Sequence, residues 1–242
     1  MPRFHVDQPL AIGRVIELPE DTARHALGAL RLREGDGITL FNGHGGEYAG
    51  KLEQHGKHAA VRLLTRADPP RESGLRITLA QGISSGDRMD LTLQKSVELG
   101  VAAIQPLMMR RSVVRLAGEK AEKRLRHWRA VVIAACEQCG RNLPPPVADI
   151  LDFTAWLRES QLPEVPCYLL DPEAETRLGD LPVPTGPLVL VAGPEGGFDP
   201  AERRAAAALG CQSVRMGPRI LRTETAALAT LAAMQALWGD FR

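Results

Sequence analysis

The sequence predicts an α/β fold in which a mostly parallel sheet, covered by helices, follows a small β-barrel. Up to about residue 68, short strand-like segments are separated by turns rich in Gly and Asn. Residues 68–74, which read DPPRESG, then break both the strand and the helix periodicity, as a linker does. Beyond them, apolar strand-like runs alternate with helical segments, the pattern of a parallel sheet. We therefore expect two domains, residues 1–70 and residues 74–242.

The first domain is predicted to be the barrel because its β-patterned segments are short and joined by turns. The turn at residues 42–46 suits a hairpin, since Asn and Gly tolerate positive φ. Asp21 to Leu32 is the segment with a helical pattern. The expected strands are residues 13–18, 37–41, 47–52 and 60–64.

The second domain is predicted to contain strands buried on both faces, because their runs are apolar throughout and do not alternate with polar residues. Helical segments of 3.6-residue periodicity separate most of these strands. The expected strands are residues 75–80, 102–108, 167–170, 188–192 and 211–215. The expected helices are residues 87–99, 119–139, 153–159, 201–209 and 223–238.

Positive charge is concentrated in residues 105–141, which hold nine Lys/Arg against three Asp/Glu, a balance of +6. Residues 1–70 hold nine of each and balance to zero. Within the basic segment, the helix at 119–139 carries an apolar stripe, with Lys and Arg mainly outside it. Such a patch can neutralise RNA phosphates, and a solvated helix face explains it equally well.

The final helix, residues 223–238, has apolar residues all around its axis. We therefore expect it to be buried nearly all round. In a domain of this size, such burial calls for a second subunit as well as the sheet, so a homodimer is predicted. A central helix within a monomer is the alternative.

The composition, with 44% hydrophobic and 24% charged residues and a net charge of +1, is that of an ordinary globular protein. No stretch approaches the roughly 18 apolar residues of a membrane span, and no signal region opens the chain, so we expect a cytoplasmic protein without membrane contact. Four cysteines in 242 residues do not make a disulfide scaffold. We expect Cys136, Cys139, Cys167 and Cys211 to be thiols, and we expect no metal, because the first two lack a second ligand pair.

Two glycine-rich loops follow predicted strands of the second domain. The first reads GPEGGF at residues 193–198, and Asp199, Pro200 and Glu202 then have the form of a capped helix start. The second reads GPRILR at residues 217–222, after which Thr223 can cap the final helix. In open α/β sheets ligands bind beyond the carboxyl ends of strands, so both loops are expected at a binding crevice. Structural turns account for the glycines almost as well.

The pair GPEGGF and MGPRILRTETA (residues 216–226) resembles the bacterial family that methylates N3 of a uridine in 16S ribosomal RNA. The resemblance extends to residues 30–36, 94–101 and 137–142 and so covers nearly the whole chain. It departs from the family pattern in one place, where the sequence reads Gln94-Lys95-Ser96. The resemblance implies a PUA-like RNA-binding barrel joined to a SPOUT domain with a C-terminal trefoil knot. Knots are very rare, and the residue pattern alone predicts an unknotted sheet.

The resemblance also implies S-adenosylmethionine (SAM) as the cofactor, bound at three loops that follow strands. It gives no metal. The implied cofactor-binding residues are Leu169, Leu170, Asp171, Gly193, Pro194, Glu195, Gly196, Gly197, Met216, Gly217, Ile220, Leu221, Arg222, Thr225 and Ala226.

Methylation at N3 of uridine requires loss of a proton that leaves only well above neutral pH, so the site needs a base. Glu137 and Glu224 are the candidate bases, and Arg141 and Arg222 are candidates for stabilising the negative charge on the uracil oxygens. Structural roles compete with these. Glu224 also suits a helix N-terminus, and Glu137 also suits an ion pair with Arg141 four residues later.

The expected partner is 16S ribosomal RNA within the small subunit. Arginine binds phosphate bidentately and aromatic rings stack on unpaired bases, although Phe4 equally suits the core. The candidate RNA-binding residues are Arg3, His25, Arg31, Arg33, Arg110, Arg111, Arg115 and Asn142. Two other functions stay open. One is methylation of ribose 2′-hydroxyls, and the other is a non-catalytic RNA-binding factor in ribosome assembly.

Overall fold

The computed structural model describes residues 1–56, 58–160 and 164–241. The chain divides into two compact units. Unit 1 contains Met1–Glu72 and Cys136–Pro144, and unit 2 contains Ser73–Ala135 and Pro145–Arg242. The division after residue 72 falls in the segment that breaks the sequence periodicity. The return of residues 136–144 to unit 1 has no signal in the sequence.

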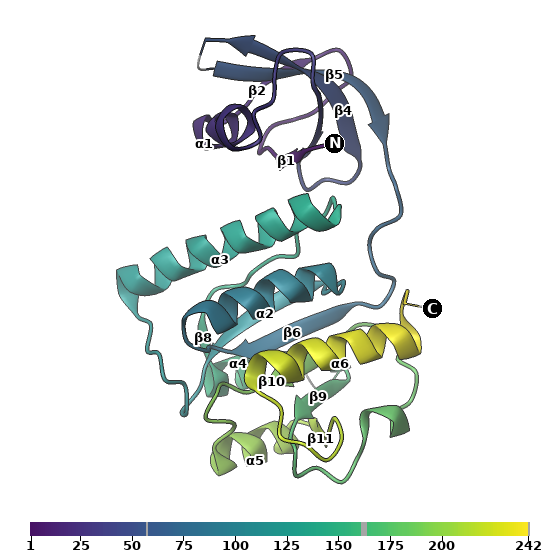
Figure 1. Ribbon diagram of the computed structural model, residues 1–242. Coiled ribbons are helices and arrows are strands. Elements are labelled where there is room, and N and C mark those ends of the chain that lie inside the picture. The colour runs from purple at the N-terminus through teal and green to yellow at the C-terminus, as the bar shows by residue number, and fades with distance from the viewer. Residues whose placement is uncertain (57, 161–163, 242) are drawn as a thin grey trace. The chain divides into compact units, whose positions relative to one another are not determined.

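Unit 1 is built on a curled sheet with the strand order β1-β3-β4-β5-β2 (Figure 1). Its strands are β1 (Arg3–His5), β2 (Val15–Glu17), β3 (Gly37–Phe41), β4 (Glu47–His55) and β5 (His58–Ala67). β1 is parallel to β3, and the other described pairs are antiparallel. The sequence predicts a small β-barrel. The structure has a curled sheet in its place, with β1 and β2 at the two edges. β1 has three residues, too few to show a strand periodicity in the sequence.

The single helix predicted for residues 21–32 is wrong. The structure has a short α1 (Glu20–Arg24) followed by one π-helical turn, η1 (His25–Ala29), closed by a hydrogen bond from Leu30 N–H to the carbonyl of His25. Gly28 inside the turn lowers its helix propensity, which contributes to the early end of α1. Phe4 is 4% exposed and lies in the core of unit 1, which decides between its two interpretations in favour of packing.

Unit 2 contains a parallel sheet with the strand order β11-β9-β10-β6-β7-β8, as the alternating pattern predicts. The strands are β6 (Ile77–Gly82), β7 (Ala103–Met108), β8 (Leu151–Asp152), β9 (Cys167–Leu170), β10 (Leu188–Ala192) and β11 (Gln212–Val214). β8 was not predicted, because two residues carry no periodicity. The parallel arrangement brings the carboxyl ends of the strands to one edge of the sheet.

Helices cover the sheet of unit 2. Those that lie wholly in unit 2 are α2 (Gly86–Glu98), α4 (Phe153–Glu159), α5 (Pro200–Ala208) and α6 (Thr223–Trp238), while α3 (Gly118–Cys139) begins in unit 2 and ends in residues that belong to unit 1. Figure 1 shows α2 and α6 side by side in front of the sheet. α4 and α5 pack together and share a core cluster with strand residues such as Ala80, Leu169 and Val191. The capping box expected at α5 is present, with Asp199 as N-cap and Glu202 reaching back to it.

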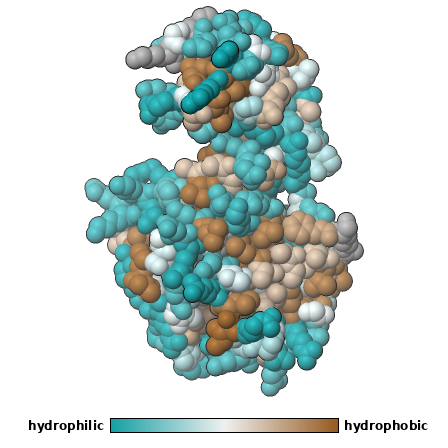
Figure 2. Space-filling view, viewed as in Figure 1, coloured by the Kyte–Doolittle hydropathy of each residue, from teal (hydrophilic) through white to brown (hydrophobic). Residues whose placement is uncertain are grey.

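The sequence led us to expect that α6 is buried nearly all round. Within one chain it is not. Its buried residues fall on one face of the helix, while Ala236 is exposed and Leu237 is 45% exposed. The reason is that the sheet and α2 cover a single side of α6. Figure 2 shows apolar side chains gathered over this helix. The buried residues of α6 are Thr223, Ala227, Thr230, Leu231, Met234 and Gln235.

The expectation of four free thiols is also wrong. Cys167 at the start of β9 and Cys211 just before β11 form a disulfide, with their Cα atoms 4.6 Å apart. β9 and β11 are neighbouring parallel strands, and this pairing brings together two residues that lie 44 apart in sequence. Counting cysteines cannot reveal such a long-range pairing. Cys136 and Cys139 are free thiols.

Among the described residues, no helix combines the length and the apolar character that crossing a membrane requires.

Candidate functional site

A pocket with a volume of about 320 Å³ opens in unit 2 where β9, β10 and β11 end. Leu170, Ala192 and Val214, the last residues of these strands, lie in its wall. The loops that continue from them complete the wall, together with the first turn of α6. This is the edge at which open parallel sheets bind ligands.

Most of the residues implied as cofactor-binding line this pocket. Leu169, Gly217 and Thr225 do not. Leu169 points into the core at 1% exposure, which is the alternation expected one residue before a strand end. Those that line the pocket are Leu170, Asp171, Gly193, Pro194, Glu195, Gly196, Gly197, Met216, Ile220, Leu221, Arg222 and Ala226.

The loop at residues 193–197 needs glycine at two positions. One glycine allows close packing, and the other allows a left-handed backbone conformation. A Cβ on Gly196 would lie 2.8 Å from the Cβ of Arg111, too close for any side chain. Gly197 has φ +67°, a left-handed conformation that favours glycine, and a Cβ there would meet nothing within 4 Å. The loop is therefore closely packed at Gly196, whereas there is open space next to the α-carbon of Gly197.

Glu195 is held at the wall of the pocket by one of its two carboxylate oxygens. Oε1 accepts hydrogen bonds from the N–H and the hydroxyl of Ser85, each at 2.8 Å, and from Arg88 at 3.1 Å. Burial by itself would raise the pKa of Glu195, but these hydrogen bonds outweigh it and hold the pKa below its usual range. Oε2 is buried and has no hydrogen-bond partner among the described residues. Glu195 is thus an ionised residue of the pocket wall, and one of its two oxygens has hydrogen-bonding capacity that the described residues leave unused.

The lowered pKa of Glu195 makes its contribution to stability depend on pH. A carboxyl whose pKa is lower in the folded state stabilises the fold above its unfolded pKa, near 4.5, and loses this effect as pH falls through the folded pKa. We expect Glu195→Gln to unfold at a lower temperature than the parent protein at pH 7. That difference should shrink as the pH is taken below 4.5. Thermal unfolding at a series of pH values measures it, with the exposed Glu175→Gln as a control; a difference that does not change with pH would contradict the ionised assignment.

Glu224 presents a second unpartnered carboxylate oxygen. It lies in the first turn of α6 and lines the pocket, and its Oε2 is buried without a hydrogen-bond partner among the described residues. Arg222 precedes it as the N-cap, is exposed, and makes no side-chain capping bond. Of the four candidate catalytic residues, the structure brings Arg222 and Glu224 together in the pocket.

The sequence suggested that Thr223 caps α6, but it does not. It is the first residue of the helix, and its hydroxyl donates to the carbonyl of Gly193 at 2.5 Å. It also accepts a hydrogen bond from the side chain of Gln81 at 3.1 Å. A hydroxyl at the start of a helix matches the sequence pattern of an N-cap. Only the folded structure shows that this hydroxyl instead binds the carbonyl of Gly193.

Glu137 and Arg141 belong to unit 1 and have structural contacts there. Glu137 accepts a hydrogen bond from the backbone N–H of His5 at 2.9 Å, and burial raises its pKa against the effect of this bond. Arg141 is buried and forms an ion pair with Glu72 at 2.7 Å. The contacts found are thus with Glu72 for Arg141 and with His5 for Glu137, where the sequence had suggested an i, i+4 ion pair as the structural role.

The candidate RNA-binding residues of unit 1 fall into two groups. Arg3 is largely buried and donates to Asn142 Oδ1 at 2.7 Å, as well as pairing with Glu47. His25, Arg31 and Arg33 are exposed. The exposed side chains of His25, Arg31 and Arg33 are accessible to a partner. The side chains of Arg3 and Asn142 instead bind each other inside the unit.

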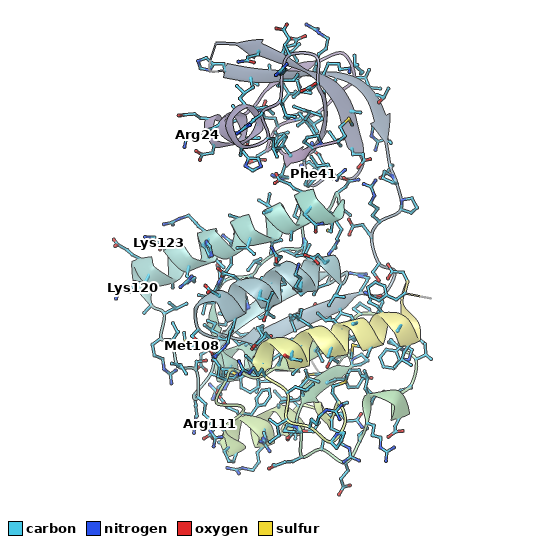
Figure 3. The ribbon with its side chains drawn as sticks, in the orientation of Figure 1. Arg24, Phe41, Met108, Arg111, Lys120 and Lys123 are labelled. Carbon is cyan, nitrogen blue, oxygen red and sulfur yellow. A yellow bond between two sulfur atoms is a disulfide. The ribbon has the colours of Figure 1, made fainter. Side chains whose placement is uncertain are left out.

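In unit 2, the loop after β7 carries Arg110, Arg111 and Arg115, of which Figure 3 labels Arg111. Arg115 binds the carbonyls of Met109 and Arg110, so its guanidinium shapes the loop. Arg111 lines the pocket and donates to the carbonyl of Gly196 at 3.3 Å. Figure 3 also shows Lys120 and Lys123 on α3, extending from the helix.

Sequence reasoning missed several residues of the pocket wall. Phe198 and Val214 lie next to predicted residues, so the strand pattern could have included them. Arg88 and Arg203 come from the first turns of α2 and α5, and no motif marked them. Arg203 forms an ion pair with the buried Asp171 at 3.1 Å. The other missed residues are Pro172, Ala192, Arg219 and Thr223, and Arg111 and Glu224 had been assigned other roles.

No group of three or more His, Cys, Asp or Glu side chains that could hold a metal occurs in the described ranges. Cys136 and Cys139 also lack the character of a redox centre. Burial raises the pKa of the Cys136 thiol to about 12, so it stays protonated at neutral pH.

Fold and site together define an α/β protein that binds a small ligand at the carboxyl edge of a parallel sheet. Two family models match the chain. The model described as an RNA methyltransferase domain matches residues 71–235, and the one described as an RNA methyltransferase PUA domain matches residues 18–64. The chain belongs to this family of RNA methyltransferases, as the resemblance of its motifs implies.

Similar proteins support the assignment over the full chain. A ribosomal RNA small subunit methyltransferase E from Neisseria gonorrhoeae, in a crystal structure bound to SAM, is 46% identical, with a TM-score of 0.92 and complete coverage of both chains. A putative methyltransferase from Legionella pneumophila, in complex with SAM, is 38% identical, with a TM-score of 0.94 and coverage of 99% and 98%. The ribosomal RNA small subunit methyltransferase E of Buchnera aphidicola (Schizaphis graminum) is 31% identical over 99% of this chain and 98% of its own.

Proposed function

We propose that this protein transfers a methyl group from SAM to N3 of a uridine in 16S ribosomal RNA of the small subunit. The observation that carries the proposal is the pocket of unit 2 at the ends of β9, β10 and β11, whose wall contains the GPEGG loop with Glu195 and the first turn of α6 with Glu224. The relatives that are ribosomal RNA small subunit methyltransferases E, and the two similar structures with bound SAM, support it. Such an enzyme works where ribosomes are assembled, so a cytoplasmic location is part of the proposal.

The residues of the pocket fit SAM. Its volume of about 320 Å³ lies within the range of roughly 300–1,000 Å³ that is usual for small-molecule sites. Leu170, Val214 and Leu221 give it apolar walls suited to an adenine ring. Glu195 places a negative charge in the wall, which suits a cationic amino group, and Gly197 has no side chain that would narrow the pocket. When bound, SAM supplies a methyl group on a positively charged sulfur, ready for transfer to an unprotonated acceptor.

Glu224 is assigned as the base that takes the N3 proton of uridine. Glu224 lines the pocket, and its buried Oε2 has no donor among the described residues, so a substrate that reaches this oxygen meets no competing hydrogen bond. Arg222 is adjacent, exposed and always positively charged, which suits it to stabilising negative charge on the uracil oxygens. Glu137 and Arg141 stay the alternative pair, with the contacts in unit 1 described above.

Contact with RNA is assigned to exposed arginine and histidine side chains of both units. His25, Arg31 and Arg33 serve this purpose in unit 1, and Arg110 and Arg111 in unit 2. Arg3, Asn142 and Arg115 have internal hydrogen bonds that would have to be shared with an RNA partner.

The decisive experiment incubates the protein with isotopically labelled SAM and small ribosomal subunits that lack the modification. Nucleoside analysis by mass spectrometry then identifies the product. We expect labelled 3-methyluridine at one position. A label on a ribose 2′-hydroxyl would replace this proposal by the ribose methyltransferase alternative, and RNA binding without SAM binding would favour the assembly factor.

We also propose that the C-terminal segment is threaded in a trefoil knot. Arg215 pairs with the chain after β9, donating to the carbonyl of Thr176, and Thr223 then bonds to the loop after β10. The segment between them is thus held by two earlier loops, as threading requires. A crystal structure whose closed backbone trace reduces to a trefoil would support this, and a trace that unties would overturn it.

A second copy of this chain is proposed to cover the apolar face of α6. Eleven of the sixteen side chains of this helix are apolar, yet those on one face are only partly buried in a single chain. Covering the face would remove apolar surface from water, which favours association. We expect Ala236→Glu to shift the protein from dimer to monomer in sedimentation, because it places a charge on this face. Leu64→Glu, at an exposed leucine of unit 1, is the control and should leave the dimer intact; a monomeric parent protein would refute the proposal.

A further inference from the structure

We propose that Thr223, supported by Gln81, is a positioning residue that fixes the GPEGG loop against the first turn of α6. The inference rests on the proposed binding of SAM in this pocket and adds two residues to which no cofactor role was assigned. Thr223 contributes its hydroxyl to a chain of hydrogen bonds behind the pocket wall, and Gln81 lies at the end of the central strand β6.

The direction of each hydrogen bond follows from the groups involved. The Gln81 side-chain amide donates from Nε2 to the carbonyl of Gly82 at 3.0 Å and to Thr223 Oγ1 at 3.1 Å. The opposite amide orientation would place two oxygens against each other at Gly82, so Nε2 must face this carbonyl. Because Thr223 Oγ1 accepts from Gln81, its single proton is left for the carbonyl of Gly193, at 2.5 Å. The order Gln81 to Thr223 to Gly193 is therefore fixed.

The three residues belong to three separate segments, of which those of Gly193 and Thr223 line the pocket and that of Gln81 does not. Gln81 pairs in register with Ala192 on β10, and Gly193 begins the loop that follows. Thr223 begins α6, whose first turn carries Glu224. Losing the Thr223 hydroxyl would therefore release the contact between the loop that holds Glu195 and the helix that holds Glu224.

Burial and close packing make this contact strong. Gln81 is 0% exposed and Thr223 is 8% exposed, so water cannot readily replace either partner. The loop is also packed tightly behind Gly193, because a Cβ on Gly82 would lie 2.6 Å from the nitrogen of Pro194. A displaced Gly193 carbonyl would have to move toward the pocket.

Purely structural stabilisation is the competing explanation, and α6 offers a matched control for it. Thr230 is also 0% exposed and also uses its hydroxyl inside the protein, donating to the carbonyl of Ala226 at 2.7 Å. It is not part of the pocket wall. Thr223→Val and Thr230→Val each remove one buried hydroxyl from the same helix at nearly constant volume.

The test measures SAM affinity by calorimetry and stability by thermal unfolding, in the full chain without RNA. Both valine variants should lose stability, but only Thr223→Val should weaken SAM binding, by roughly ten- to a hundredfold, as expected when a buried polar partner is left unsatisfied. Thr223→Ser keeps the hydroxyl and should restore affinity to within a few-fold of the parent value. Gln81→Met is the second variant if Thr223→Val does not fold, and it should weaken SAM binding in the same direction.

Parent-like SAM affinity in Thr223→Val or Gln81→Met would overturn the positioning role, as would an equal loss of affinity in Thr230→Val. Failure of the parent protein to bind SAM would instead refute the proposed function. The two failures are therefore distinguishable.

Discussion

Glu224→Gln is expected to lower the single-turnover rate of methyl transfer by about 10²- to 10⁴-fold, the usual contribution of a positioned general base. The amide keeps the shape of the carboxyl group but cannot accept the N3 proton of uridine. SAM affinity should change little, since the role of Glu224 lies in the transfer step. Quenched-flow measurement with saturating enzyme and labelled SAM isolates that step.

A pH profile strengthens this test. Uridine loses its N3 proton to water as the pH rises, so the rate of Glu224→Gln should recover steadily toward high pH, while the parent rate levels off earlier. A base that had only a structural role would give parallel profiles.

Glu137→Gln is the matched control, with the same substitution at a carboxylate that accepts the backbone N–H of His5. It is expected to stay near the parent rate. A large loss in Glu137→Gln together with a parent-like Glu224→Gln would move the base to unit 1. Parent-like rates in both would remove the general base from the mechanism altogether.

Removing the disulfide between Cys167 and Cys211 is expected to destabilise the protein by about 2–4 kcal/mol, the typical effect of a crosslink in the loop-entropy description. The bond closes a stretch of 44 residues between neighbouring strands. For a protein of this size, the loss corresponds to a fall of roughly 5–15 °C in the unfolding temperature. Cys167→Ala with Cys211→Ala, measured by calorimetry, tests this value.

Two comparisons separate the crosslink from simple loss of packing. Cys136→Ala removes a fully buried thiol that forms no disulfide, and should cost less. A dithiol reductant should lower the unfolding temperature of the parent protein and leave that of the double variant unchanged. If the reductant has no effect on either protein, the disulfide does not contribute to stability.

Where local chemistry decided the outcome, the sequence predicted the fold closely. The strands at 37–41, 167–170 and 188–192 and the helix at 153–159 occur with the predicted bounds. Each is a compact apolar run or begins at a clear N-cap, such as Asp152. The two-residue β8 was missed because it is too short to show a periodicity and is defined by its pairing with the distant β7. The π-helical turn at 25–29 was missed because a helical sequence pattern does not distinguish it from a continued α-helix.

The same division applies to the site. The glycine loops at residues 193–197 and 217–222 could be recognised as strand-end loops, because their residues and spacing are local signals. The unpartnered oxygens of Glu195 and Glu224 could not, since they depend on which donors the fold places nearby. Arg203, which pairs with Asp171, and Thr223, which binds Gly193 instead of capping a helix, required the tertiary arrangement for the same reason.

The composition of unit 1 has a consequence for how this chain can be divided. Residues 136–144, which reach it from more than sixty positions downstream of Glu72, supply the partners of Arg3, His5 and Glu72 through Asn142, Glu137 and Arg141. A fragment that stops at Glu72 would leave two charged side chains and a backbone N–H without these partners. Unit 1 is therefore discontinuous in the sequence. Exchanging residues 1–72 between relatives as one uninterrupted piece would transfer only part of the interactions that stabilise the unit.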